Sequence, residues 1–243
     1  MCKIGIQLYA VRKPFWENAA DTFRALSQMG YSEVEGFGGY TCRAAELDKM
    51  LKDNGLAVCG WHTGLDHLTR DKYLATLEYH DRIGNKILGI NAGMEMLDTD
   101  DKIKWLRDSM HEAMELIAPY GFTLEYHNHW WEFEDKNNAY CKLVDGADFA
   151  LQFDMGNALK GGMRGLDLLN KYNGRCVAVH CKPYGVEAGF DCSIGDEQDS
   201  VAWSDIIPEL KKQNIEHFTI ECEGVEDQLE LARKNIEGLK KFV

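Results

Sequence analysis

The sequence lacks several patterns that would point to a familiar class of site. It has no Cys-x-x-Cys pair, so a zinc ribbon or a thioredoxin-like dithiol has no support. No Gly-x-Gly-x-x-Gly motif follows a strand-like run, and the glycine-rich stretch at residues 36–39 lacks the Lys-Ser/Thr of a phosphate-binding loop. No apolar run reaches the roughly 18 residues that could span a bilayer. These absences argue against nucleotide-binding, zinc-ribbon and membrane-spanning proteins.

The chain also has fewer basic than acidic residues. The chain has 27 Lys and Arg against 40 Asp and Glu, and this net charge of −13 opposes the approach of a phosphate backbone. Nucleic acid is therefore a poor partner, and an abasic-site endonuclease is disfavoured. Residues 1–7 enter a strand-like run without a signal-peptide pattern, and the eight cysteines are scattered. We expect a soluble cytoplasmic protein with reduced thiols.

What the sequence does contain is a repeated unit of an extended apolar run, an amphipathic stretch, often a Gly, and another extended run. The glycines expected to stop the helices are Gly30, Gly55, Gly121 and Gly174. The unit after the fifth run is the least regular, with only a brief helix predicted over residues 138–144. The extended runs lie at residues 3–9, 33–37, 56–62, 86–90, 122–127, 149–154, 175–181 and 217–222.

Eight alternating units in about 240 residues match the usual size of a closed (β/α)8 barrel. No linker rich in Pro, Gly or Ser divides the chain. We therefore expect an α/β protein that forms a single TIM-barrel domain over residues 1–243. In such a barrel, the active site lies at the carboxyl ends of the strands.

Four runs in the second half of the chain end on a residue that can bind a metal. These residues are Glu125, Asp154, His180 and Glu221, and their separations of 29, 26 and 41 residues are each close to one strand-plus-helix unit. Neighbouring parallel strands would bring all four to the same rim. Three carboxylates and one imidazole suit a divalent cation, with Mn²⁺ the first choice and Mg²⁺, Co²⁺ or Zn²⁺ as alternatives.

The register of the fifth run leaves this ligand set open at one position. Alternation puts Glu125, His127 and His129 on the same face of the strand. One of the two histidines could therefore replace or supplement Glu125 at the metal. By the same alternation, Cys181 and Cys222 face away from the rim and are interpreted as packing residues.

Two glutamates beside a divalent cation indicate proton abstraction next to a carbonyl group. In this interpretation Glu125 and Glu221 form the acid–base pair of a sugar isomerase or epimerase. The alternative is that both glutamates only bind the metal and that water or Lys182 transfers the proton. The sequence does not separate the two mechanisms.

Other polar and aromatic residues are predicted at the same rim. His62 ends the third run, where it could hydrogen bond a substrate hydroxyl or carbonyl. His127 and His129 belong to a polar, aromatic segment suited to sugar hydroxyls, and Lys182 shares the face of His180. Trp16 is predicted to form an apolar wall beside the substrate.

Several segments together resemble a known family, and the likeness runs the length of the chain. The segments are residues 4–12, 30–35, 125–129, 153–157, 180–182 and 220–221. They are similar to the xylose-isomerase-like TIM barrels that include sugar phosphate isomerases/epimerases. The resemblance implies a divalent metal held by the four residues named above, with the two glutamates as acid–base pair. It also implies that Glu35 faces the barrel mouth and contacts substrate.

The chain departs from many relatives at two positions. Asn157 stands where they carry a second histidine, and Pro183 stands where they carry an aspartate. These changes leave the metal ligands intact and alter the substrate contacts, among which we still count Asn157. Residues 126–129 are also similar to those of family members that act on inososes, keto-sugars or glycosides, some of them by elimination.

Three functions therefore remain. The first is a metal-dependent ketose isomerase or epimerase of carbohydrate metabolism. The second, a lyase or dehydratase acting on a keto-sugar, keto-glycoside or inosose, shares the first step. The third, from another class, is a barrel that binds a sugar without converting it. The expected partner is a small sugar or keto-sugar without phosphate, and the sequence leaves open whether identical subunits assemble.

Overall fold

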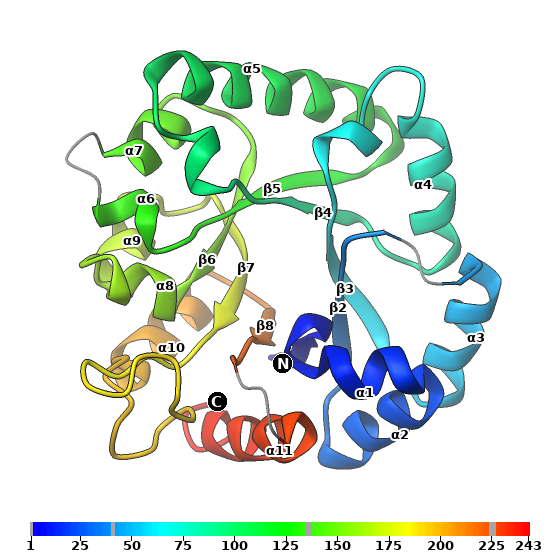
Figure 1. Cartoon of the computed structure of the whole chain (residues 1–243), viewed down its shortest axis with the longest axis vertical. Helices are drawn as coiled ribbons and strands as arrows, with labels where there is room; N and C mark the ends of the chain where they lie inside the picture. Colours follow the sequence, from blue (N-terminus) through cyan, green and yellow to red (C-terminus); the bar gives the residue numbers. More distant parts are fainter. Residues whose placement is uncertain (1, 40–41, 135–137, 224–226) are drawn as a thin grey trace.

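The computed structural model shows a closed barrel of parallel strands inside an outer ring of helices (Figure 1). It describes residues 2–39, 42–134, 138–223 and 227–243. Within these residues eight strands pair in sequence order, and β8 closes on β1. The predicted (β/α)8 barrel is therefore confirmed.

The strands begin and end within two residues of the predicted runs. They are β1 (Lys3–Gln7), β2 (Glu33–Phe37), β3 (Ala57–His62), β4 (Ile87–Ile90), β5 (Thr123–His127), β6 (Ala150–Asp154), β7 (Cys176–Cys181) and β8 (His217–Ile220). The α-helices are α1 (Arg12–Glu17), α2 (Ala19–Met29), α3 (Ala44–Asp53), α4 (Tyr73–Arg82), α5 (Asp100–Ile117), α6 (Trp131–Glu134), α7 (Ala139–Val144), α8 (Met155–Lys160), α9 (Gly165–Lys171), α10 (Trp203–Lys212) and α11 (Gln228–Leu239). Short 3-10 helices are η1 (Leu8–Val11), η2 (Leu65–His67), η3 (Met94–Met96) and η4 (Ala118–Tyr120).

Local chemistry explains where the helices start and stop. The Thr99 side chain accepts a hydrogen bond from the Lys102 N–H and caps α5, which satisfies one of its unpaired first-turn donors. Gly30 ends α2 with φ 97°, and Gly121 follows η4 with φ 74°. These are left-handed conformations that favour glycine. Both glycines were predicted stop signals.

Two ends differ from the predicted runs. β1 stops at Gln7 because the Gln7 side chain accepts a hydrogen bond from Tyr9 N–H at 3.2 Å and starts η1. Trp16 consequently lies on α1. β8 stops at Ile220, so Glu221 is the first residue beyond the strand.

The hydrophobic core includes several of the thiols. The eight cysteines, all within the described residues, are free thiols, and Cys181 and Cys222 pack in the core as predicted. In the described part of the chain, no helix is long and apolar enough to cross a membrane.

Candidate metal centre

Four buried or nearly buried side chains meet where β5 to β8 end. They are His127, Asp154, His180 and Glu221, and one donor atom from each lies within 4.8 Å of the others. The strand register explains the meeting, because Asp154 is aligned with His180 and His180 with Thr219. Glu221, two residues after Thr219, returns to the inward face.

The donor atoms are spaced as ligands of one ion would be. His180 Nδ1 lies 3.0 Å from His127 Nε2, 2.7 Å from Glu221 Oε2 and 3.9 Å from Asp154 Oδ2. His127 Nε2 lies 3.5 Å from Asp154 Oδ2. Two ligands at right angles on an ion with bonds of about 2.1 Å lie about 3 Å apart. The residues present therefore fit a divalent cation.

Unsatisfied polar atoms support the same conclusion. Asp154 Oδ2 is buried and has no hydrogen-bond partner among the described residues. The other oxygen, Oδ1, accepts the Asn157 N–H at 2.7 Å and caps α8, which fixes the carboxylate in place. A buried carboxylate oxygen without a donor is costly unless a cation or water satisfies it.

Glu35 on β2 orients His180 from below. Its Oε2 accepts from His180 Nε2 at 2.6 Å and from Gln7 at 2.5 Å, and its Oε1 accepts from Gln152 at 2.5 Å. Burial alone would raise the pKa of Glu35, but His180, His62 and the hydrogen bonds lower it to about 2. A proton on Nε2, facing this carboxylate, would leave the Nδ1 lone pair directed at a cation held by the other three donors.

Glu125 occupies a deeper position on β5. Its side chain is completely buried, and neither carboxylate oxygen has a hydrogen-bond partner in the described chain. Burial and the nearby Glu35 charge raise the pKa of Glu125 well above its ordinary value, against the opposing effect of His180. On β5 it is His127, and not Glu125, that belongs to the group of four. Strand alternation had left this alternative open.

A cavity of about 580 Å³ lies over this group. Among the predicted substrate residues, five line it. Glu35 lies below it, and Trp16 is not part of its lining but contacts the cavity-lining Phe37, with ring centroids 5.9 Å apart. The five are His62, His127, His129, Asn157 and Lys182.

Lys182 brings a positive charge to the cavity wall. Its Nζ lies 2.9 Å from Glu221 Oε1 and 2.5 Å from Glu223 Oε1, and its side chain is nearly inaccessible. Burial would lower the pKa of Lys182, but Glu221, Asp154 and Glu223 raise it. Burial raises the pKa of Glu221, yet Lys182 and His180 hold it well below its ordinary value. The two groups therefore form an ion pair at the cavity.

Sequence reasoning missed several residues that shape the site. Gln7, Tyr9 and Glu223 line the cavity, and a polar Gln in the apolar β1 run was the one available signal. Glu132 is buried and accepts hydrogen bonds from the Tyr126 hydroxyl at 3.0 Å and the His129 N–H at 2.9 Å. It therefore fixes the segment that follows β5, on a helix too short to show a pattern.

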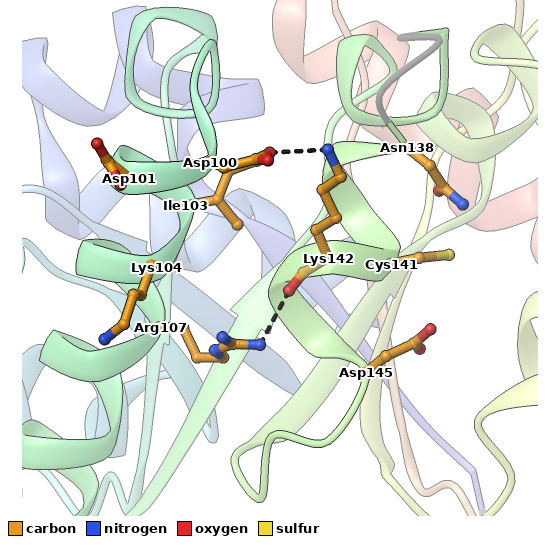
Figure 2. Close-up of a pocket in the computed structure, with 9 residues that line it drawn as sticks. All are labelled: Asp100, Asp101, Ile103, Lys104, Arg107, Asn138, Cys141, Lys142 and Asp145. Carbon is orange, nitrogen blue, oxygen red and sulfur yellow. Dashed lines mark hydrogen bonds and ion pairs between the residues drawn. The ribbon is translucent and has the colours of Figure 1, made fainter.

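A second cavity, of about 660 Å³, lies on the outer surface between α5 and α7 (Figure 2). Three of its charged groups are engaged with neighbours, since Lys142 Nζ bonds Asp100 Oδ1 at 2.7 Å and Arg107 donates to the Lys142 carbonyl at 3.2 Å. The cluster of metal-type donors lies at the barrel rim instead, so we assign the site there.

Fold and site define a (β/α)8 barrel with a metal-type donor group at the carboxyl ends of its strands. The chain belongs to the xylose isomerase-like TIM barrel family, whose model matches residues 23–242. No curated protein matches the sequence.

Solved structures share the fold at low sequence identity. A sugar phosphate isomerase/epimerase from Parabacteroides distasonis is 20% identical, with a TM-score of 0.82 over 99% of this chain and 98% of that one. An L-ribulose 3-epimerase is 16% identical, with a TM-score of 0.72 over 99% and 95%. A barrel protein from Mycobacterium smegmatis in complex with magnesium is 15% identical, with a TM-score of 0.65 over 91% and 87%. At these identities the likeness establishes the fold.

Proposed function

We propose that this protein is a divalent-metal-dependent sugar isomerase or epimerase that abstracts a proton next to a carbonyl group. The observation that carries the proposal is the group of His127, Asp154, His180 and Glu221, which lies directly beneath a polar cavity. Structures with the same fold include an L-ribulose 3-epimerase and a D-tagatose 3-epimerase-like protein.

The four residues would hold the cation through two imidazole nitrogens and two carboxylates. This donor set suits Mn²⁺ first, with Mg²⁺, Co²⁺ or Zn²⁺ as alternatives. When bound, such a cation polarises a substrate carbonyl and stabilises the negative charge that develops on its oxygen. Glu35 acts as a positioning residue because it orients His180 without facing the cavity.

Glu221 is the best-placed group to remove the proton. Its carboxylate lines the cavity, and the lowered pKa keeps it ionised and able to act as a base. The neighbouring Lys182 ammonium would stabilise negative charge on the substrate.

The second proton-transfer group is Glu125 or a residue that lines the cavity. The sequence pairs Glu221 with Glu125, whose raised pKa favours its protonated form, but its carboxyl lies one layer below His127 on β5. Lys182 is the cavity-lining alternative.

A lyase or dehydratase acting on a keto-sugar is the second candidate. It would begin with the same proton abstraction, and a protonated Lys182 beside Glu221 could assist the departure of a leaving group. A sugar-binding barrel without turnover is the candidate from another class.

Metal analysis followed by solvent deuterium incorporation tests the proposal. Purified protein should hold about one equivalent of metal, and with Mn²⁺ it should exchange the hydrogen next to the carbonyl in a panel of ketoses, inososes and keto-glycosides. The product then separates isomerase from lyase. Exchange that persists in Glu221→Gln would contradict the assignment of the base, and the absence of both metal and exchange would favour a binding protein.

A further inference from the structure

The mouth of the cavity has aromatic walls above a polar floor. The floor includes Asn157, Lys182 and Glu221, whereas Tyr9 and Phe37 line one side and Trp131 lines the other. Because β5 lies four positions from β1 in the closed barrel, the segments that follow these strands face each other across the mouth.

The wall above β1 and β2 has uncovered aromatic surface. It consists of Tyr9, Trp16 and Phe37, with the Tyr9 and Phe37 rings edge to face at 5.3 Å and Trp16 against Phe37 at 5.9 Å. Tyr9 is 46% exposed and Trp16 is 56% exposed. Arg12 lies over Tyr9, 4.3 Å from the ring centroid, and helps to hold this ring in place.

The wall above β5 is less exposed, because Trp130 and Trp131 are both only partly accessible. The Trp131 ring is stacked on His129 at 4.2 Å with an interplanar angle of 9°. Lys160 Nζ lies over the Trp130 ring at 4.0 Å. A planar ligand group would therefore find open aromatic surface on the Tyr9–Trp16–Phe37 wall.

The residues that line the cavity include two hydrogen-bond donors without a partner, one on the floor and one on the wall above β5. Asn157 Nδ2 and Trp131 Nε1 are buried, come from residues that line the cavity, and have no hydrogen-bond partner among the described residues. Buried donors without partners are costly, so a ligand that supplies oxygen atoms would satisfy them. Hydroxyl and carbonyl oxygens of a sugar-like ring meet this need.

A phosphate group is a poor match for the same cavity. Of the described residues that line it, Lys182 is the one Lys or Arg, and its ammonium is engaged by Glu221 and Glu223. A dianionic group would meet these two carboxylates. The cavity therefore favours a neutral ligand.

We propose that the substrate has two parts, a polyhydroxylated ring on the polar floor and a planar apolar substituent against the Tyr9–Trp16–Phe37 wall, as in an aryl glycoside. This inference rests on the proposed sugar chemistry and adds its substrate class. Aromatic rings attract one another beyond simple area burial, so the substituent should add measurable affinity.

Calorimetry with matched ligands tests the proposal. The full-length protein with Mn²⁺ is titrated with methyl and phenyl β-glycosides of glucose, galactose and xylose, and with phenol alone. We expect the phenyl member of at least one pair to bind about tenfold more tightly than the methyl member, a difference of about 1.4 kcal/mol. Phenol should bind more weakly than the phenyl glycoside.

Matched variants identify the wall. Tyr9→Ala should reduce the phenyl-to-methyl affinity ratio to about one, whereas Tyr120→Ala should leave it intact. Tyr120 is 48% exposed, nearly the same as Tyr9, but it precedes β5 at the opposite end of the barrel.

Three results would overturn the proposal: no pair with a phenyl preference, a preference that survives in Tyr9→Ala, or phenol that binds as tightly as the glycoside. A changed elution volume for Tyr9→Ala with an unaltered ratio would also overturn it, because the wall would then be an interface between copies. The affinities are measured without turnover. A negative result for the aromatic wall would therefore leave the metal-content and deuterium-exchange tests of the proposed function unaffected.

Discussion

At the scale of single residues, sequence and geometry differ on which β5 residue belongs to the donor group. The sequence favours Glu125, and the geometry favours His127. We expect His127→Gln to lower Mn²⁺ affinity at least tenfold, because it removes one imidazole from the group of four. Glu125→Gln should keep about one equivalent of metal, since Glu125 is outside the group of four and glutamine closely matches glutamate in shape. Isothermal titration of both variants with Mn²⁺ measures the contrast.

The same pair of variants also tests the predicted acid–base role of Glu125. If Glu125→Gln retains metal and most deuterium exchange, Glu125 has a structural role in the barrel interior. If it retains metal but loses exchange, Glu125 is the second proton-transfer group. Loss of metal from Glu125→Gln with retention in His127→Gln would reverse our ligand assignment.

Glu35 permits a second test at this scale. Glu35→Gln removes the negative charge that accepts from His180 Nε2, and loss of such an orienting carboxylate typically costs 10–100-fold in metal affinity. Glu33→Gln is the matched control, because Glu33 is a buried carboxylate on the same strand that bonds His217 at 2.8 Å, away from the metal group. Equal losses of Mn²⁺ affinity in both variants would show a general effect on the barrel.

At this scale the sequence predicts which residues meet wherever strand alternation is sufficient. Asp154, His180 and Glu221 each follow an apolar run, and parallel strands bring such residues to one rim. The choice between Glu125 and His127 depends on which of them lies at the same depth in the barrel as Asp154, His180 and Glu221. The sequence of one strand does not contain this information. The Glu35–His180 contact joins residues 145 positions apart, so local patterns carry no trace of it.

At the scale of elements, His80 connects α4 to β4 and makes this unit sensitive to acid. His80 Nδ1 lies 3.1 Å from Asn85 Nδ2, and the same amide donates to the Ile87 carbonyl at 2.9 Å. Burial, with a smaller effect of His67, lowers the pKa of His80 to about 3, although Asp81 opposes this shift. The folded protein therefore keeps His80 neutral while the unfolded chain is protonated below about pH 6.5.

This difference fixes the sign of the pH dependence. Between about pH 6.5 and 3 the unfolded state binds the extra proton, so stability falls as pH falls, by up to about 1.4 kcal/mol per pH unit for this group. Urea unfolding at pH 7 and pH 5 should show a smaller pH effect in His80→Gln than in the wild type. His111→Gln on α5 is the control, and an unchanged pH effect in His80→Gln would refute the assignment.

Element boundaries were predictable wherever a glycine or a capping residue marks them. Gly30 and Gly121 stop their units in the left-handed conformation, as the sequence indicated. The early end of β1 was not predictable, because it depends on the Gln7 side chain bonding to Tyr9 N–H rather than on apolar pattern. The unit after β5 lacks periodicity because α6 and α7 have only four and six residues.

At the scale of the whole molecule, the repeat of eight units predicts the closed barrel, since each strand and helix can bury its apolar face only against its neighbours. The mouth could not be predicted in the same way. Its walls come from segments beyond β1, β2 and β5 that meet only because the barrel closes.

Because the barrel is closed, metal binding should raise the stability of the whole fold. The four donors come from the ends of β5 to β8, so a cation that binds them connects half of the barrel and stabilises the folded state alone. At a free Mn²⁺ concentration of 100 times Kd, this binding adds about 2.7 kcal/mol. For a chain of this length, that corresponds to a rise in Tm of roughly 5–10 °C.

Differential scanning fluorimetry with Mn²⁺ and with EDTA measures this shift in Tm. A control is needed because the net charge of −13 could attract Mn²⁺ to the surface. Surface carboxylates could bind Mn²⁺ weakly wherever they lie, so the His127→Gln variant, which keeps the surface charge, is compared with the wild type. We expect the wild type to gain stability at micromolar Mn²⁺ and His127→Gln to gain little. An equal shift in both would mean that the surface binds the cation, and the group at the rim would lose its assignment.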